Sequence, residues 1–448
     1  MPLSRRELFA LAAAVLQARG ADKQGMIVRS TRPEDLEMPP DGFSTWITPV
    51  EKLFVRHHHY AARVEVNEWK LEVGGLVDKP VSLTYEQIRK LPRVEQVAVI
   101  ECAGNGRGLY EPSVPGLQWE QGAVGNVRWA GVRLVDVLRM TGVKTGAREV
   151  LMDGADQPIG TMPKFQRTLP LTKAMHSGTL LAYELNGQPL PPIHGFPLRV
   201  IASGWASDSW TKWLSKLTLL DKDFEGFFMA TAYRHPVKPV PPGSAVDPKQ
   251  MRPVTDLRVK SVIASPVDGS SVAPGAVKIS GVAWTGPGQV VEVRVSLDAG
   301  RTWNPARLGA EQSKYGWRLW EFMTPPLAAG YYNVMAQARD SAGDVQPLTA
   351  EWNPSGYLWN VVPRIGLAVG MPAAAKPAAA PETPPLPQGF KTHCLTCHEM
   401  DVITQQRLTK GQWEREVDKM IRWGAPVKPE DRTGIIEFLS GRYSPTRR

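Results

Sequence analysis

Residues 97–110 read VAVIECAGNGRGLY, an apolar run that ends in a turn with three alternating glycines. The run predicts a buried strand, and Cys102 stands where that strand ends. The glycines allow the backbone to approach a ligand closely, and Arg107 adds a permanent cation. A free cysteine is most often a small buried hydrophobe. The neighbouring arginine instead favours a thiolate, so Cys102 is a candidate ligand for a soft metal.

Further motifs follow in a fixed order on both sides of this stretch. They are LFVRHHH at 53–59, GLQWEQGAVGNVRWAGVRL from Gly116, LMDGAD ending at Asp156, HGFPLRV from His194, TKWL from Thr211, GRTWNPARL, GWRLWEF and WNPSGYLWN. Together they cover residues 40–365 and resemble the sulfite oxidase family of molybdenum–molybdopterin enzymes. Each motif is weak alone, but the ordered set is specific.

The resemblance implies an α+β molybdopterin-binding domain over residues 25–245 and an immunoglobulin-like dimerisation domain over residues 255–365. Alternating apolar and polar positions at 257–362, with turns about every ten residues, also predict a β-sandwich. The resemblance implies that Cys102 is the single protein thiolate on molybdenum, beside one pyranopterin. The implied substrate pocket is lined by Arg56, Arg107 and Trp119. The implied ligands of the pterin and its phosphate are His58, Asp156, His194, Arg199 and Lys212.

One position departs from the family pattern. The family places a tyrosine five residues before the proline of the motif that reads TLP here, and this chain has Phe165. We therefore expect a pocket without that phenol, which leaves the sulfur substrate open, and Arg167 is a candidate replacement donor. The triplet His57–His59 could suggest a metal site. Neighbouring residues of an extended segment point to opposite faces, so all three cannot easily bind one ion.

Residues 394–398 read CLTCH, the pattern of a c-type haem attachment site. Cys394 and Cys397 would form thioethers to the haem, and His398 would be the proximal iron ligand. A zinc or redox CxxC is the alternative, which the immediate histidine disfavours. Met420 is the expected second axial ligand; alternatively it packs on the porphyrin, and another group or water binds iron. We expect a small all-α cytochrome c domain at 389–448.

One segment of the sequence predicts export, and another predicts a linker. Residues 1–22 place two arginines before a short apolar run, which is typical of a twin-arginine signal, with an amphipathic first helix as the alternative. This signal predicts a periplasmic protein that is exported folded. Residues 371–388 are dominated by proline and alanine and predict an extended linker. No stretch of the sequence is long and apolar enough to predict a membrane span.

Composition limits the functional class. Among 448 residues, 53 lysines and arginines against 44 acids give a net charge of +9. These charges are scattered among acids, so a nucleic-acid partner is not expected, and three cysteines exclude a disulfide framework. The sequence predicts a homodimeric sulfite dehydrogenase that contains molybdenum–molybdopterin and haem c and passes electrons to an external c-type cytochrome or another acceptor.

Two alternatives remain open. The first is a sulfane dehydrogenase-like molybdoenzyme that acts on carrier-bound sulfur, or on another small oxyanion or S-oxide. The second is an electron carrier whose molybdenum domain serves only as a dimerising scaffold. Retention of Cys102, Arg56 and Arg107 argues against the scaffold.

Overall fold

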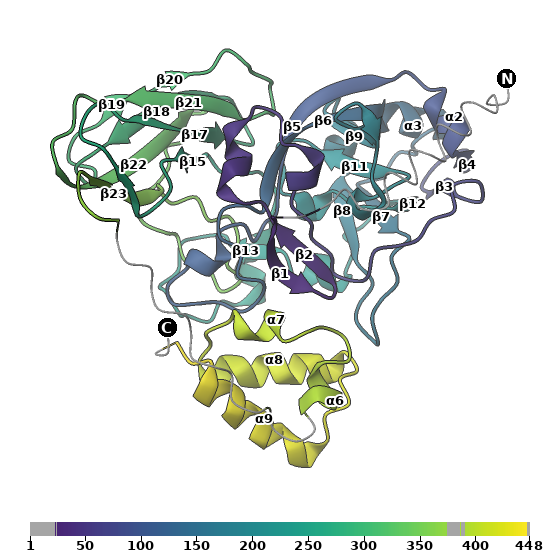
Figure 1. Ribbon diagram of the computed structural model, residues 1–448. Coiled ribbons are helices and arrows are strands. Elements are labelled where there is room, and N and C mark those ends of the chain that lie inside the picture. Colours follow the sequence, from purple (N-terminus) through teal and green to yellow (C-terminus); the bar gives the residue numbers. More distant parts are fainter. Residues whose placement is uncertain (1–22, 24, 374–385, 387–389, 446–448) are drawn as a thin grey trace.

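The long strand β5 (Val94–Glu101) is buried from Val97 onward, because its second half is an apolar run. The computed structural model describes residues 23, 25–373, 386 and 390–445. Figure 1 shows three bodies: a first domain on the right, a sandwich on the left and helices below. The expected signal at 1–22 and most of the expected linker at 371–388 lie outside the described residues.

The first domain contains two five-stranded sheets whose residues contribute to one core. The sheet that contains β5 runs β10-β9-β6-β5, with β11 paired to β9: β6 (Val124–Arg133), β9 (Thr179–Leu185), β10 (Gln188–Pro189) and β11 (Arg199–Ala202). The other sheet runs β4-β3-β12-β7-β8: β3 (Lys70–Gly75), β4 (Val81–Thr84), β7 (Glu149–Gly154), β8 (Gln166–Pro170) and β12 (Leu214–Leu220). Its helices are short: α2 (Tyr85–Arg89), α3 (Leu134–Thr141), α4 (Leu171–Ala174) and α5 (Phe227–Ala230).

Two hairpins and several one-turn helices complete this part of the chain. The hairpins are β1 (Ile27–Thr31) with β2 (Glu34–Glu37), and β13 (Arg234–Pro236) with β14 (Met251–Pro253). The one-turn helices are Pro40–Ser44, Val50–Lys52, Arg107–Leu109, Pro192–His194, Ser207–Ser209 and Pro248–Gln250. Figure 1 shows the first hairpin directly above the C-terminal helices.

The second domain is a sandwich of a four-stranded and a five-stranded sheet. The first sheet runs β15 (Lys260–Ser265), β17 (Lys278–Trp284), β21 (Arg318–Met323) and β20 (Arg307–Leu308). The second runs β16 (Ser270–Val272), β23 (Arg364–Val369), β22 (Gly330–Asp340), β18 (Val290–Ser296) and β19 (Asn304–Pro305). The expected α+β domain and β-sandwich are both observed.

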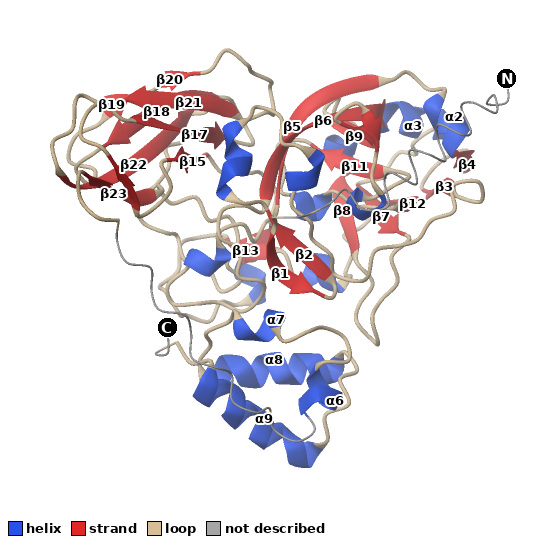
Figure 2. Ribbon diagram, in the orientation of Figure 1, coloured by secondary structure: helices blue, strands red, loops and turns tan. Residues whose placement is uncertain are grey.

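Residues 390–445, which we call the C-terminal body, form helices α6 (Phe390–Cys394), α7 (Asp401–Thr404), α8 (Lys410–Arg422) and α9 (Pro429–Arg442). Helix α8 begins with a capping box, because the Thr409 hydroxyl accepts from the Gln412 amide and the Gln412 side chain accepts from the Thr409 amide. Figure 2 shows this body as helices and loops beneath a strand-rich molecule. The described residues of this body form helices and no strand, and the cytochrome c domain expected here, with its haem, stays a prediction. Across the described part of the chain, we find no helix with the length and hydropathy of a membrane span.

Candidate active site

Cys102 follows β5 directly and is buried, at 7% exposure. Its amide donates to the Ala123 carbonyl at 2.9 Å, and the Asn105 amide donates to the Cys102 carbonyl at 2.9 Å. Gly106 has a φ of 92°, and a Cβ there would lie 2.5 Å from Trp359. Only glycine fits that position, so the glycine-rich turn fixes the direction of the thiol.

Glu101 connects this turn to the second domain through hydrogen bonds. Its carboxylate accepts hydrogen bonds from Asn105 Nδ2 at 2.8 Å, Lys260 Nζ at 3.0 Å and Trp284 Nε1 at 2.7 Å. Lys260 is 2% exposed, and both it and Trp284 lie on the four-stranded sheet of the sandwich. The buried carboxylate is thus compensated by a cation and further donors. The second domain therefore positions the strand end that carries Cys102.

A cavity of about 60 Å³, which we call the metal cavity, opens beside Cys102. Its lining brings together eight residues that the sequence singles out: Arg56, His58, Cys102, Asp156, Phe165, His194, Arg199 and Lys212. Further lining residues were not assigned from the sequence: Phe54, His57, Ile100, Ser207, Asp208, Trp210, Trp213 and Tyr233.

The metal cavity contains cations that the protein does not neutralise fully. Burial lowers the pKa of Arg199 to about 9, and its Nε has no hydrogen-bond partner. Burial, followed by repulsion from Arg199, holds the pKa of Lys212 well below its ordinary value. Asp156 lies in the same cavity, but burial raises its pKa to about 6. Buried cations require an anion, so this donor set fits the phosphate of a pyranopterin.

His194 is oriented by Lys23, a residue that belongs to none of the sequence motifs. Lys23 Nζ donates to the carbonyls of Val50 and Leu53, at 2.6 and 2.8 Å, and lies 3.2 Å from His194 Nε2. Burial holds the pKa of His194 well below its ordinary value, so the ring is neutral. Its Nε2 then accepts from Lys23, which leaves the proton on Nδ1.

Tyr233 supplies a phenol to the metal cavity, although position 165 itself carries none. The Tyr233 hydroxyl lies 2.7 Å from His58 Nε2, and its ring stacks on Tyr357 with centroids 5.2 Å apart. Phe165 packs its ring on His58, 4.2 Å between centroids. The hydroxyl comes from a segment after α5, which the motif around residue 165 could not reveal.

Arg167 does not line the metal cavity, which corrects its assignment as a replacement donor. Its guanidinium pairs with Asp208 at 2.6 Å, and both side chains are 1% exposed. It also lies over the Tyr233 ring, 5.3 Å from the centroid. The ion pair with Asp208 therefore holds the Arg167 guanidinium against the Tyr233 ring. Trp119 is likewise absent from the lining, and its side chain is fully buried in the core of the first domain.

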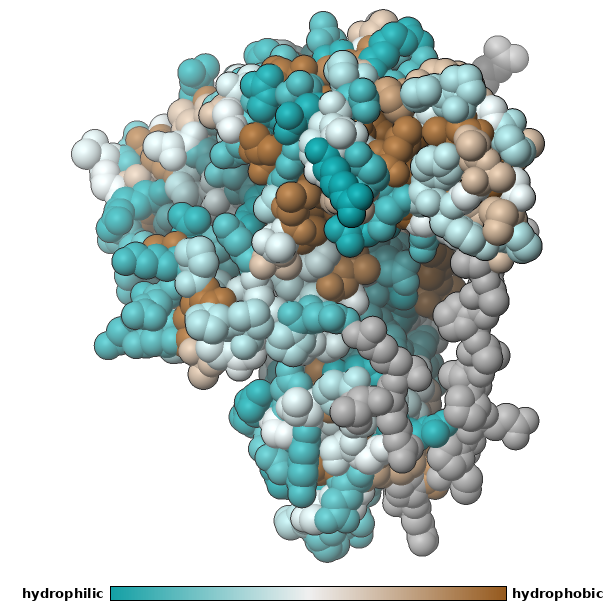
Figure 3. Space-filling model, turned by 90° about the vertical axis from the view of Figure 1, so that its left-hand side faces the viewer, coloured by the Kyte–Doolittle hydropathy of each residue, from teal (hydrophilic) through white to brown (hydrophobic). Residues whose placement is uncertain are grey.

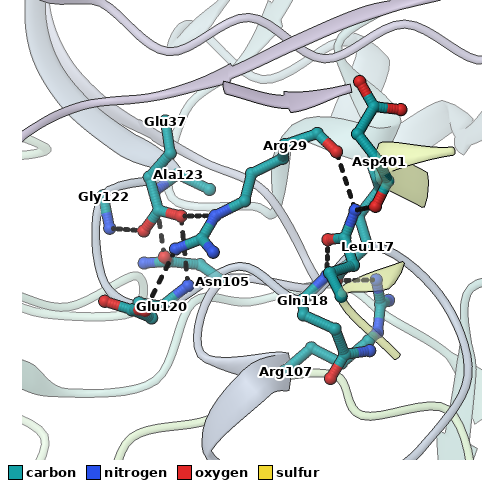
Figure 4. A network of polar contacts seen from close by, with 11 residues as sticks. Arg29, Glu37, Asn105, Arg107, Leu117, Gln118, Glu120, Gly122, Ala123 and Asp401 are labelled. Atoms are coloured by element: carbon teal, nitrogen blue, oxygen red, sulfur yellow. Dashed lines mark hydrogen bonds and ion pairs between the residues drawn. The ribbon is translucent and has the colours of Figure 1, made fainter. Parts of the chain in front are cut away.

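Arg107 lies beside the metal cavity rather than in its lining. Its Nη1 donates to the Leu117 carbonyl and its Nε to the Ser355 carbonyl, both at 3.2 Å. Figure 4 shows Arg107 next to Leu117. Burial raises the pKa of the Cys102 thiol, while the charges of Arg56 and Arg107 oppose that rise. The free thiol is therefore protonated at neutral pH, and a bound metal ion would displace its proton.

A second cavity, of about 250 Å³, lies between the first domain and the C-terminal body; we call it the interdomain cavity. Its lining includes all four residues expected to bind haem: Cys394, Cys397, His398 and Met420. The first domain contributes, among others, Arg56, His57, His58, Gly116, Leu117 and Met162. Arg56, His57 and His58 line both cavities and form a wall between them.

The chemistry of the interdomain cavity fits a haem. The His398 ring places Nδ1 3.1 Å from the Glu399 carbonyl, so Nδ1 donates and Nε2 is left for a metal. Burial raises the pKa of Cys394 to about 11, so this thiol stays protonated. Met420 lines the cavity, whereas Met400 does not. Among the described residues, no group of three or more His, Cys, Asp or Glu side chains is arranged to hold a metal ion.

Comparison with known proteins gives the class first. The family described as "Oxidoreductase molybdopterin binding domain" matches residues 57–228, and "Mo-co oxidoreductase dimerisation domain" matches residues 251–369. The fold and site thus define a molybdopterin-binding oxidoreductase with a dimerisation domain. The solved sulfane dehydrogenase SoxCD from Paracoccus pantotrophus is similar, with a TM-score of 0.67 and 29% identity over 75% of this chain and 85% of that chain.

Relatives then give the family. Sulfite oxidase from Gallus gallus is 33% identical over 75% of this chain and 76% of its own length; that from Arabidopsis thaliana is 32% identical over 77% and 94%. The chain belongs to the sulfite oxidase family. Human mitochondrial sulfite oxidase is 35% identical over 76% of this chain, but the match spans only 65% of that relative's length.

Proposed function

We propose that this protein is a sulfite dehydrogenase that oxidises sulfite to sulfate and passes electrons singly through its own haem c. The observation that carries the proposal is the wall of Arg56, His57 and His58 shared by the metal cavity and the interdomain cavity. A group bound in one cavity would lie close to a group bound in the other. Electrons would then pass to an external c-type cytochrome or another acceptor.

Different residues of the metal cavity would bind the metal, the pterin and the substrate. Cys102 would hold molybdenum, and Arg199 and Lys212 would hold the anionic end of the pterin. When bound, the molybdenum cofactor supplies two-electron oxygen-atom transfer. Arg56 is held by Asp35, 3.3 Å from its Nη1, and provides a fixed cation for a sulfite oxygen. With the His58 proton on Nε2, this ring donates to the Tyr233 oxygen and leaves the phenolic proton free for the same anion, while the Tyr357 ring fixes the position of the phenol.

The C-terminal body would hold the haem. We propose thioethers at Cys394 and Cys397 and axial ligation by His398 and Met420, since all four line one cavity. The Met420 thioether, as an axial ligand, would raise the reduction potential of the haem. A raised potential suits a haem that accepts electrons from a metal site. When bound, the haem accepts one electron at a time, so two transfers would complete each turnover.

We also propose a homodimer built through the second domain. The match to a dimerisation domain over residues 251–369 supports it. Figure 3 looks onto this side of the molecule and shows apolar patches among hydrophilic residues. Exposed apolar side chains of the second domain include Val291, Met323, Tyr331, Val345 and Leu348. For residues 1–22 we propose a twin-arginine signal and periplasmic export, which fractionation of cells expressing the full chain would test.

A second candidate function is sulfane dehydrogenation of carrier-bound sulfur. The similarity to the solved sulfane dehydrogenase over 75% of this chain favours it. One anaerobic experiment separates the candidates: loaded protein receives either sulfite or a sulfur-loaded carrier protein, and the haem α-band is recorded. Reduction by free sulfite supports the proposed function. Reduction by carrier-bound sulfur alone would establish the second candidate instead.

A further inference from the structure

We propose that docking of the C-terminal body is coupled to Arg107 through three residues, Gly116 to Gln118, which we call the bridging segment. Glutamines of the C-terminal body contact this segment's amides, and Arg107 contacts the carbonyl between them. The coupling rests on the proposed function, which requires an anion in the metal cavity, and it adds that Arg107 beside that cavity contributes to binding this anion. The proposed docking contact does not depend on that function.

The C-terminal body binds the bridging segment through two neighbouring glutamines. Gln406 Oε1 accepts from the Gly116 amide at 3.0 Å, and Gln405 Oε1 accepts from the Gln118 amide at 2.8 Å. The other ends of both carboxamides are also engaged. Gln405 Nε2 donates to the carbonyls of Arg29 and Asp401, and Gln406 Nε2 donates to the Val402 carbonyl. The bonds to Asp401 and Val402 lie within the C-terminal body, so they hold both acceptor oxygens in place before the domains meet, whereas the bond to Arg29 forms on docking.

Arg107 contacts the carbonyl between those amides. Its Nη1 donates to Leu117 at 3.2 Å, and a Cβ added to Gly116 would lie 3.0 Å from the same nitrogen. The guanidinium therefore lies against the backbone of the bridging segment. Figure 4 shows Arg107, Leu117 and Gln118 as one continuous group, with Arg29 and Asp401 beside them. A shift of the bridging segment would move the carbonyl that orients Arg107.

Further polar contacts cross this interface. The Thr31 amide and hydroxyl donate to Asp401, at 2.7 and 2.9 Å. Arg32 Nη2 donates to the Leu395 carbonyl at 2.7 Å and pairs with Glu399 at 3.0 Å. The Thr161 amide donates to the Trp423 carbonyl at 3.2 Å. Phe227 and Trp423 also meet across the interface, with ring centroids 5.6 Å apart, so apolar contact contributes to docking as well.

The contacts of Arg107 determine whether docking strengthens or weakens anion binding. Arg107 donates Nε to Ser355 and Nη1 to Leu117, so its guanidinium is held from two sides beside the metal cavity, where its charge acts on Cys102. Docking fixes the Leu117 carbonyl and so holds the guanidinium in one orientation. Docking therefore strengthens anion binding, and by thermodynamic reciprocity a bound anion strengthens docking. Substrate would thus favour the arrangement in which the two cavities share a wall.

Hydrogen exchange of the full-length, molybdenum-loaded protein tests the docking contact. The double variant Gln405→Ala/Gln406→Ala should exchange the amides of Gly116 and Gln118 faster, by about fivefold for each lost hydrogen bond. The control is Asp418→Asn, on α8, because Asp418 pairs with Arg432 inside the C-terminal body. Unchanged protection of the bridging segment in the double variant would overturn the docking contact.

Two further measurements test the coupling. Sulfate, added as an unreactive anion, should increase protection of the bridging segment in the wild type but not in Arg107→Met. With ferricyanide as acceptor, the double glutamine variant should raise the KM for sulfite about fivefold with little change in kcat. Lost protection with an unchanged KM and no sulfate response would overturn the coupling. A wild type that oxidises no sulfite contradicts the proposed function alone, because the exchange measurements need no turnover.

Arg32→Ala is the control for misfolding of the double glutamine variant, because it breaks interdomain contacts to Leu395 and Glu399 by a change in the first domain. It leaves the C-terminal body itself unaltered. Faster exchange of the bridging segment in this variant would support docking independently of the glutamines. Wild-type exchange in Arg32→Ala, together with an altered circular dichroism spectrum of the glutamine variant, would overturn the proposal.

Discussion

Replacing Lys260 by methionine removes the cation that compensates a buried carboxylate next to Cys102. Lys260 and Glu101 have side-chain exposures of 2% and 8%, and their 3.0 Å contact joins the second domain to the metal site. Removal of one partner from a buried ion pair costs about 3–5 kcal/mol, because the other charge stays buried without its partner. We therefore expect Lys260→Met to lower the free energy of unfolding by about that amount.

Chemical denaturation followed by tryptophan fluorescence measures this loss. Lys278→Met is the matched control, because Lys278 is 57% exposed and pairs with Glu321 on the same sheet. An exposed pair contributes about 0–1 kcal/mol, so the control should unfold almost as the wild type does. The double variant Glu101→Gln/Lys260→Met should recover part of the loss. Equal effects of Lys260→Met and Lys278→Met would refute the role assigned to this pair.

Three further predictions concern the cofactor, the substrate and pH. Lys23→Met removes the group that orients His194, and should weaken retention of molybdenum about 10-fold or more, measured as the metal-to-protein ratio after dialysis; an unchanged ratio contradicts this role. Tyr233→Phe removes the hydroxyl beside His58 and should lower kcat/KM for sulfite about tenfold, whereas unchanged kinetics would exclude the phenol from the reaction. Burial lowers the pKa of His235 to about 4. Because the unfolded chain then binds more protons, the wild type should lose stability as the pH falls from about 6.5 to about 4, and His235→Gln should lose less over that range.

The sequence predicted those features of the site that short motifs carry. The apolar run before Cys102 is the buried end of β5, and seven residues chosen from ordered motifs line one cavity together with Phe165. Alternation of apolar and polar residues likewise predicted the sandwich. These features follow from local patterns or from a resemblance, so no knowledge of long-range packing was needed.

The remaining features depend on contacts between distant segments. Tyr233 enters the metal cavity from beyond α5, and Lys23 reaches His194 across 171 positions of sequence. Arg167 was expected in the pocket because it lies two residues after Phe165, where the sequence departs from the family pattern. The structure instead pairs it with buried Asp208. A sequence pattern cannot show which buried partner a charge will find, because that choice is made by tertiary packing.

Anaerobic addition of sulfite to the loaded full-length protein tests the central claim most directly. The haem α-band reports whether electrons from sulfite cross the wall of Arg56, His57 and His58, and Cys102→Ser serves as the control without the metal thiolate. We predict that sulfite reduces the haem in the wild type and not in Cys102→Ser, while dithionite reduces it in both. A haem that stays oxidised with sulfite in molybdenum-loaded wild type, yet responds to dithionite, would contradict the account.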